Sequence, residues 1–258
     1  MRNLCSIGRI FYGISVGGMG ILTIYYKSFS YMLLPPQFLT PSHSIVAYIS
    51  GALLFLIGAL IVLERKTRTV SLLLGSILLL IFCFLYIPYM FSVHSNYKHL
   101  TEWENAEKEL ALAGGAFIIA GIFSEKKENS FNPFWRKLIS FGAILFSIPI
   151  VSFGILHFLL AKEVATMVPS WIPYPVFWTY FAGTALIGSG IAIILKIKSG
   201  LIAALLGTMI FIWFITIHVP GVITSSPDDM NGQVTSAFLA LVYSGIAFVI
   251  AGAARRMS

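Results

Sequence analysis

The stretch TVSLLLGSILLLIFCFLYIPYMF, residues 69–91, identifies the class of this protein. It carries no charged side chain, and it exceeds the ~20 apolar residues that a helix needs to cross a bilayer. A strand of a membrane β-barrel would instead alternate apolar with polar residues. We therefore predict a membrane-spanning helix here. The basic joint that precedes it, residues 64–68, would lie outside the hydrocarbon layer.

Seven further segments resemble this one in their apolar composition. The eight predicted spans are residues 7–27, 43–63, 69–91, 106–123, 138–160, 175–195, 199–217 and 233–253. Of the 258 residues, 58% are hydrophobic and 10% are charged, whereas soluble domains have about 25% charged residues. This composition excludes a soluble enzyme, a disordered tail and a fibrous protein. It predicts an all-α integral membrane protein that has the lipid bilayer as a partner.

The distribution of basic residues predicts the orientation in the membrane. If both termini are cytoplasmic, 13 of the 17 Lys and Arg residues fall on the inner side, as the positive-inside rule requires. The same rule accounts for the net charge of +7, so the charge implies no nucleic-acid partner. Arg2 lies before the first span and Arg9 lies near its start, as in a signal peptide, but no clear signal-peptidase cleavage site follows. We therefore expect this span to be retained.

The two halves of the sequence match each other. Residues 41–90 align without gaps on residues 173–222, at an offset of 132. The informative matches are Gly51 with Gly183, Gly58 with Gly190, Gly75 with Gly207 and Pro88 with Pro220. We therefore predict two tandem four-helix bundles in parallel orientation, residues 1–123 and 138–258, joined by a cytoplasmic linker at residues 124–137. The shared glycines also have a simpler explanation, since small residues let membrane helices approach closely.

Two histidines distinguish the second half from the first. His157 stands where the first half has Thr23, and His218 stands where it has Tyr86. Both lie near the outer ends of their spans and at similar distances from the inner ends, so we predict that they share one outward-facing pocket. The candidate pocket residues are His157, Glu163, Trp171, Tyr180 and His218. Imidazole can relay a proton, bind a metal or hydrogen-bond to a quinone carbonyl. Alternatively, each histidine bonds only to a backbone carbonyl, and the aromatic residues anchor helix ends.

The remaining polar residues are interpreted as structural. Glu102, Glu104, Glu107 and Glu109 predict a solvated start of the fourth span, where acids favour the helix dipole. No charge is needed at the centre of any span, so no ion path is predicted. Two histidines without a third ligand fall short of a zinc site, and no metal is predicted. The two cysteines lack a Cys-x-x-Cys spacing, which argues against a thiol oxidoreductase.

One sequence pattern in the second half is shared with known proteins. It consists of GILHF at residues 154–158, PSWIP at 169–173, Trp178 and HVP at 218–220. This pattern resembles the DoxX-like membrane proteins of the DoxX and DoxD type, here as a tandem duplication. The resemblance implies a four-helix unit in the bacterial inner membrane. It also implies an association with quinone-linked redox systems, which makes quinone a candidate cofactor, although the sequence itself identifies no cofactor.

Two hypotheses for the function follow. The first is a redox-associated subunit whose outer pocket meets a quinone headgroup and a periplasmic or membrane redox partner, although the chain has no haem or flavin motif of its own. The second is a non-enzymatic protein, either a small-solute permease or an assembly scaffold. Parallel repeats suit a transporter, but the predicted absence of a charge within the membrane counts against one. Whether the protein is an enzyme stays open.

Overall fold

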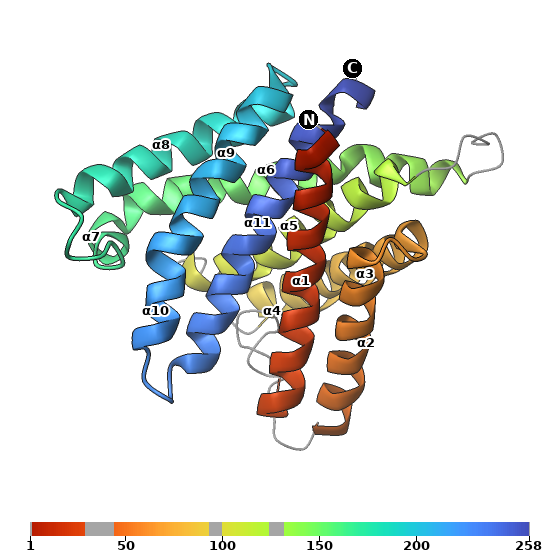
Figure 1. Ribbon diagram of the computed structural model, residues 1–258, viewed down its shortest axis with the longest axis horizontal. Coiled ribbons are helices and arrows are strands. Elements are labelled where there is room, and N and C mark those ends of the chain that lie inside the picture. The colour runs from red at the N-terminus through yellow and green to blue at the C-terminus, as the bar shows by residue number, and fades with distance from the viewer. Residues whose placement is uncertain (1, 29–43, 93–99, 124–131, 258) are drawn as a thin grey trace.

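The computed structural model describes residues 2–28, 44–92, 100–123 and 132–257, and every regular element in those ranges is a helix (Figure 1). In chain order the elements are α1 (Arg2–Tyr26), α2 (Ser44–Val62), α3 (Thr67–Ile81), η3 (Phe82–Tyr86), α4 (Ile87–Ser92), α5 (Leu100–Ile122), α6 (Pro133–Leu159), α7 (Ala161–Ala165), α8 (Pro175–Ile194), α9 (Ser199–Trp213), η5 (Phe214–His218), α10 (Val219–Thr224) and α11 (Met230–Met257). The predicted all-α class is confirmed for these residues.

Within the described residues, seven helical stretches are long and apolar enough to cross a membrane, by length and composition. They are Asn3–Tyr26, Ile45–Val62, Thr67–Phe91, Pro133–Leu159, Pro175–Ile194, Ser199–Thr224 and Met230–Ala254. The chain is therefore of the multi-pass membrane type. The remaining predicted span corresponds to α5, whose 23 residues reach about 34 Å but include several charges.

The linker between the halves is shorter than predicted. Residues 124–131 lie outside the described part of the chain, and α6 already begins at Pro133 rather than near residue 138. Asn132 caps this helix, because its side-chain oxygen accepts a hydrogen bond of 2.9 Å from the backbone nitrogen of Phe134. Proline suits the first helical position, where no intrahelical donor is needed.

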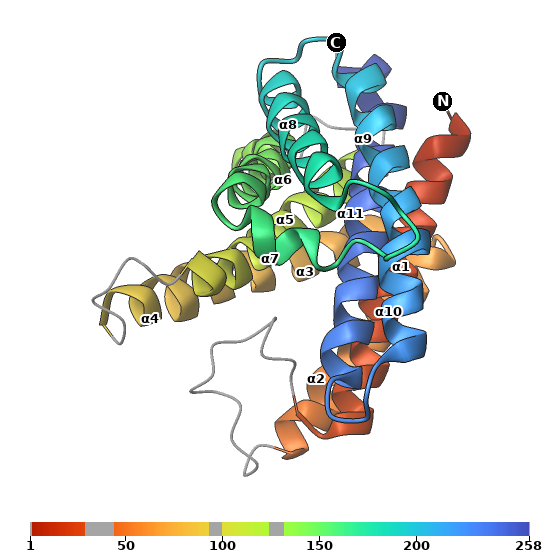
Figure 2. The same cartoon turned by 90° about the vertical axis from the view of Figure 1, so that its left-hand side faces the viewer.

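The helices pack in two groups that run in clearly different directions (Figures 1 and 2). One group contains α1, α2, α9 and α11, and the other contains α3, α5, α6 and α8. Each group therefore takes helices from both predicted halves, with α1 against α11 and α5 against α6. The groups meet where α5 touches α11 and at the two links α2–α3 and α8–α9. This arrangement differs from two bundles of four consecutive helices.

Both links between the groups are built from left-handed backbone. Glu64 and Lys66 have positive φ in the link from α2 to α3, as do Lys196 and Lys198 in the link from α8 to α9. A non-glycine residue rarely adopts this conformation. In each link it lets the chain reverse within a few residues and start the next helix, because α3 begins at Thr67 and α9 at Ser199.

A widened helical turn interrupts each of the two helices that follow these links. The π-helical turns η3 and η5 end two residues before Pro88 and Pro220, respectively. Proline has no backbone N–H and its ring collides with the carbonyl of the preceding turn. An extra residue in that turn relieves the collision and lets the helix continue. The helices therefore extend to Ser92 and Thr224 despite their prolines.

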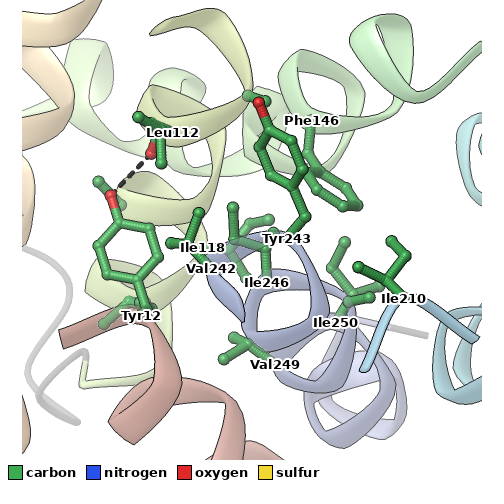
Figure 3. Close-up of a cluster of buried hydrophobic side chains, with 14 of the residues drawn as sticks. Tyr12, Leu112, Ile118, Phe146, Ile210, Val242, Tyr243, Ile246, Val249 and Ile250 are labelled. Carbon is green, nitrogen blue, oxygen red and sulfur yellow. Dashed lines mark hydrogen bonds between the residues drawn. The ribbon is translucent and has the colours of Figure 1, made fainter. Parts of the chain in front are cut away.

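The centre of the molecule is formed by α5 and α11, which run through the crossing of the two groups. Their residues from Ala111 to Ala120 and from Val242 to Ala251 are almost fully buried. Tyr12 of α1 donates a 2.8 Å hydrogen bond to the carbonyl of Leu112 on α5 (Figure 3). Phe146 of α6 packs against Tyr243 of α11, with ring centroids 6.3 Å apart. These contacts join the two groups into one core.

Candidate functional site

The first half of α5 carries a buried polar cluster. Glu109 is 2% exposed, Lys108 is 8% exposed and Asn105 is 9% exposed. The prediction of a solvated helix start is therefore wrong for Glu109, and Glu104 and Glu107 are only partly exposed. The physical reason is the position of α5, which is enclosed by α3, α6 and α11. The side chain of Glu102 lies outside the described residues.

The only lysine of this cluster is already paired within α5. The Nζ atom of Lys108 donates a 2.7 Å hydrogen bond to Oδ1 of Asn105 and lies 3.1 Å from Oε1 of Glu104. Glu104 and Lys108 are four residues apart, so their side chains meet on the same face of α5. The ion pair lies toward the start of the helix. The charge of Lys108 is thus engaged by Glu104 rather than by Glu109.

Glu109 is the most deeply buried acid in the described residues. Its Oε2 atom has no hydrogen-bond partner in this part of the chain. The hydroxyls of Tyr86 and Tyr243 are likewise buried without a partner, and both tyrosines are close enough to Glu109 to interact with it electrostatically. An isolated carboxylate in such surroundings is very costly. The carboxyl group must therefore be neutral or balanced by a bound cation.

A polar contact extends this cluster to α6. Ser152 of α6 is near enough to the side chain of Glu107 to interact with it. Farther along α6, His157 is half-buried and interacts electrostatically with Glu104. The two helices run antiparallel, so His157 lies beside the beginning of α5 and Ser152 lies deeper. The arrangement offers carboxyl, hydroxyl and imidazole groups, which can take up and release protons.

His157 is held in one orientation by two contacts. Its Nδ1 atom lies 2.7 Å from the carbonyl oxygen of Phe153, so Nδ1 carries the proton and Nε2 is left for another partner. Its ring stacks on Trp213 of α9, with centroids 6.3 Å apart. The backbone hydrogen bond that the alternative interpretation expects is therefore present at this residue. It still leaves one ring nitrogen for chemistry.

The other predicted pocket residues lie on four different elements. His218 is half-buried at the end of η5, and Tyr180 of α8 packs against Phe158 with centroids 5.3 Å apart. Trp171 is 69% exposed in the loop before α8, and Glu163 is exposed on α7. A pocket shared by His157 and His218 stays a prediction. Within the described ranges, no three His, Cys, Asp or Glu residues gather in a way that could hold a metal ion.

The acidic cluster could have been recognised from span length. The uninterrupted apolar run at the end of α5 begins at Leu110 and ends at Phe123, which is too short to cross a bilayer alone. If the helix that contains this run crosses the bilayer, it must therefore carry Glu107, Lys108 and Glu109 into the membrane. The fourth predicted span, residues 106–123, includes these residues, but the sequence pattern places their charged side chains in solvent.

A second polar site lies at the opposite end of α5. A cavity of about 190 Å³ is lined by Cys5, Ser6, Arg9, Glu64, Ile122, Phe123, Gly252 and Ala253. Arg9 is 6% exposed, donates hydrogen bonds to the carbonyls of Ile61 and Val62, and pairs with Glu64 at 2.7 Å. Arg9 therefore binds the free carbonyls in the last turn of α2 and also pairs with Glu64 in the link that follows. The guanidinium is fully engaged by these partners.

No family model, no curated protein and no solved structure matches this chain. The class of the protein therefore follows from its own fold and site. It is an all-α protein of the multi-pass membrane type with a buried acidic cluster on its central helix.

Proposed function

We propose that this protein is a small-solute permease coupled to protons, and that Glu109 carries the coupling proton. The observation that carries the proposal is the burial of Glu109 without a cationic partner. Ionisable groups within a membrane protein are expensive, and they are generally retained for transport or proton transfer. If α5 crosses the membrane, as we propose, Glu109 supplies the charge within the membrane whose predicted absence counted against a permease.

The packing of the helices supports the same proposal. Glu109 lies on α5, the helix that touches α11 where the two groups of helices meet. Because α5 and α11 belong to different groups, a tilt of one group against the other would change the surroundings of Glu109. Alternating access in secondary transporters commonly uses such rocking around a fixed site. An assembly scaffold would gain nothing from a buried acid at this place.

A quinone-linked redox subunit is the second candidate, in line with the resemblance to DoxX-like proteins. It is favoured by the stacking of His157 on Trp213, because a ring beside a free imidazole nitrogen suits a quinone headgroup. Binding of a short-chain ubiquinone analogue should then quench the fluorescence of Trp213. The quenching should disappear in Trp213→Phe and weaken in His157→Gln. Equal quenching in all three proteins would exclude this candidate.

We further propose that the two halves arose by duplication. The π-helical turns η3 and η5 are offset by 132 residues, as are the left-handed residues Glu64 and Lys196, and Lys66 and Lys198. The same offset relates the sequence matches. A protein of this kind would sit in the bacterial inner membrane, with α5 as the fourth of eight spans and both termini in the cytoplasm, as the basic residues indicate.

The proposed function predicts a proton flux that depends on Glu109. In liposomes that contain the purified protein, a pH-sensitive dye and a potassium ionophore, an external acid step should acidify the interior faster than in protein-free liposomes. Glu109→Gln keeps the size of the side chain but cannot carry a proton, so its flux should fall to the protein-free rate. Asp228→Asn, which changes an exposed acid, should leave the flux unchanged. Equal fluxes for wild type and Glu109→Gln would overturn the proposal.

A further inference from the structure

The cavity at the end of α5 contains an ion pair whose two members are buried to very different extents. The side chain of Arg9 is 7% exposed, whereas that of Glu64 is 53% exposed, and the two lie 2.7 Å apart. A guanidinium does not lose its charge in a protein, so Arg9 needs an anion wherever it stays buried. Glu64 can turn out to solvent at little cost, because its carboxylate is already largely hydrated. The pair can therefore open on the side of Glu64.

The link that contains Glu64 does not need this ion pair in order to form. The backbone hydrogen bond that closes residues 60–65 is 2.9 Å long, and the one that closes residues 192–197 in the second half is 2.8 Å long. In the second half Lys196 takes the place of Glu64, and Ala143 takes the place of the arginine, at offsets of 132 and 134. The same turn therefore closes without an arginine or an acid, which leaves the burial of the ion pair in the first half to be explained by another role.

The space beside the ion pair also distinguishes this end of the molecule. A methyl group on Gly252 would lie 2.6 Å from Cβ of Cys5, and one on Gly121 would lie 2.6 Å from Cγ2 of Ile139. Cys5 and Ile139 therefore occupy equivalent places between their helices, and the cysteine fills less of its place. The cavity of about 190 Å³ beside Cys5 exceeds the ~150 Å³ of an apolar cavity that binds benzene, so it has room for a ligand of about six heavy atoms.

The lining of the cavity favours a small organic acid. Arg9 already binds a carboxylate, and it can hold the carboxylate of a ligand in the same way. The hydroxyl of Ser6, an exposed residue, can donate a further hydrogen bond. Ile122, Phe123 and Ala253 supply an apolar wall for a short carbon chain. A neutral ligand that displaced the present carboxylate would leave the guanidinium without an anion, and a cation would be repelled by it.

We propose that Arg9 and this cavity form a binding site for a short-chain carboxylate, which takes the place of Glu64 on the guanidinium. The exchange is anion for anion, so Arg9 stays paired while Glu64 turns out to solvent. Glu109 lies in the first half of α5, away from this end, so the site does not depend on the proposed function. The carboxylate has two sources, a soluble acid or a free fatty acid in the bilayer.

Ligand-detected NMR tests the site. Saturation transfer from the purified protein in detergent to the methyl group of butanoate, corrected for protein-free micelles, should level off as the butanoate concentration rises. In Glu64→Gln the neutral amide no longer competes for the guanidinium, so half-saturation should need a concentration at least about tenfold lower. Lys196→Gln, the matched change in the other link, should not alter the half-saturating concentration. Transfer that never saturates, or an equal value in Glu64→Gln and wild type, would overturn the proposal.

A second variant tests the place of binding. Cys5→Ile puts into the cavity the side chain that Ile139 has at the equivalent place, and it retains both members of the ion pair. Saturable transfer to butanoate should be lost, and unchanged transfer would show that butanoate binds elsewhere.

Competition identifies the source of the carboxylate. Displacement of butanoate by oleate would support entry of a fatty acid from the bilayer, and butanoate binding without such displacement would support a soluble acid. Displacement by an equal concentration of inorganic phosphate would contradict a site for carboxylates.

Discussion

Replacing Gly114 with alanine is expected to destabilise the protein by about 3 kcal/mol, at the upper end of what overpacking a core costs. The added methyl group would lie 2.6 Å from the carbonyl oxygen of Gly142 and 2.7 Å from the backbone nitrogen of Phe146. Both contacts are with backbone, so a change of side-chain rotamer cannot relieve them. The helices α5 and α6 must move apart, and with them the contact between Glu107 and Ser152.

Thermal unfolding in detergent, followed by size-exclusion chromatography of the remaining folded protein, measures this effect. The midpoint should fall by on the order of 6–12 °C, since 1 kcal/mol shifts a protein of this size by roughly 2–4 °C. Gly188→Ala is the matched control, because a methyl group there meets nothing within 4 Å. It should leave the midpoint unchanged or raise it slightly, as alanine favours a helix over glycine. A midpoint for Gly114→Ala as high as that of Gly188→Ala would contradict the close packing of α5 and α6.

Reporter fusions are expected to give an all-or-none answer on orientation. A green fluorescent protein fused after Ser258 should be bright, and alkaline phosphatase at the same place should be inactive, because both termini should face the cytoplasm. The structure adds a constraint, since Cys5 of α1 lies against Gly252 of α11 and the two ends must emerge together. Phosphatase inserted beside Asp228, in the exposed turn before α11, should be active. The opposite set of results would invert the topology.

The sequence predicted most of the helices because membrane insertion depends on local properties. A run such as Thr69–Phe91 must bury its backbone in a helix wherever it sits, since lipid offers no hydrogen bonds. In the part of the chain that the structure describes, seven such stretches are confirmed, and the π-helical turns add only a local adjustment before Pro88 and Pro220. The boundaries of α6 were less predictable, because Pro133 and Asn132 start that helix inside the expected linker.

The candidate site was only partly visible in the sequence. His157 stood out because it interrupts an apolar span, and the structure gives it a stacking partner in Trp213. The role of Trp171 was less predictable, since an exposed loop residue has no local pattern that fixes its neighbours. Glu109 was assigned to solvent because acids near a helix start usually face water.

Taken by itself, the sequence determined that this chain is an all-α membrane protein with basic residues gathered toward one predicted side. Those properties follow from hydrophobicity and charge summed along each segment, which do not depend on distant residues. Only the tertiary structure decided that α1 pairs with α11 and α5 with α6, because the glycine faces that meet lie far apart in the chain. The same pairing encloses α5 on several sides and buries Glu109. Burial of a charge is a property of neighbouring helices rather than of the helix that carries it, and that is why the acid became a candidate site only in the folded protein.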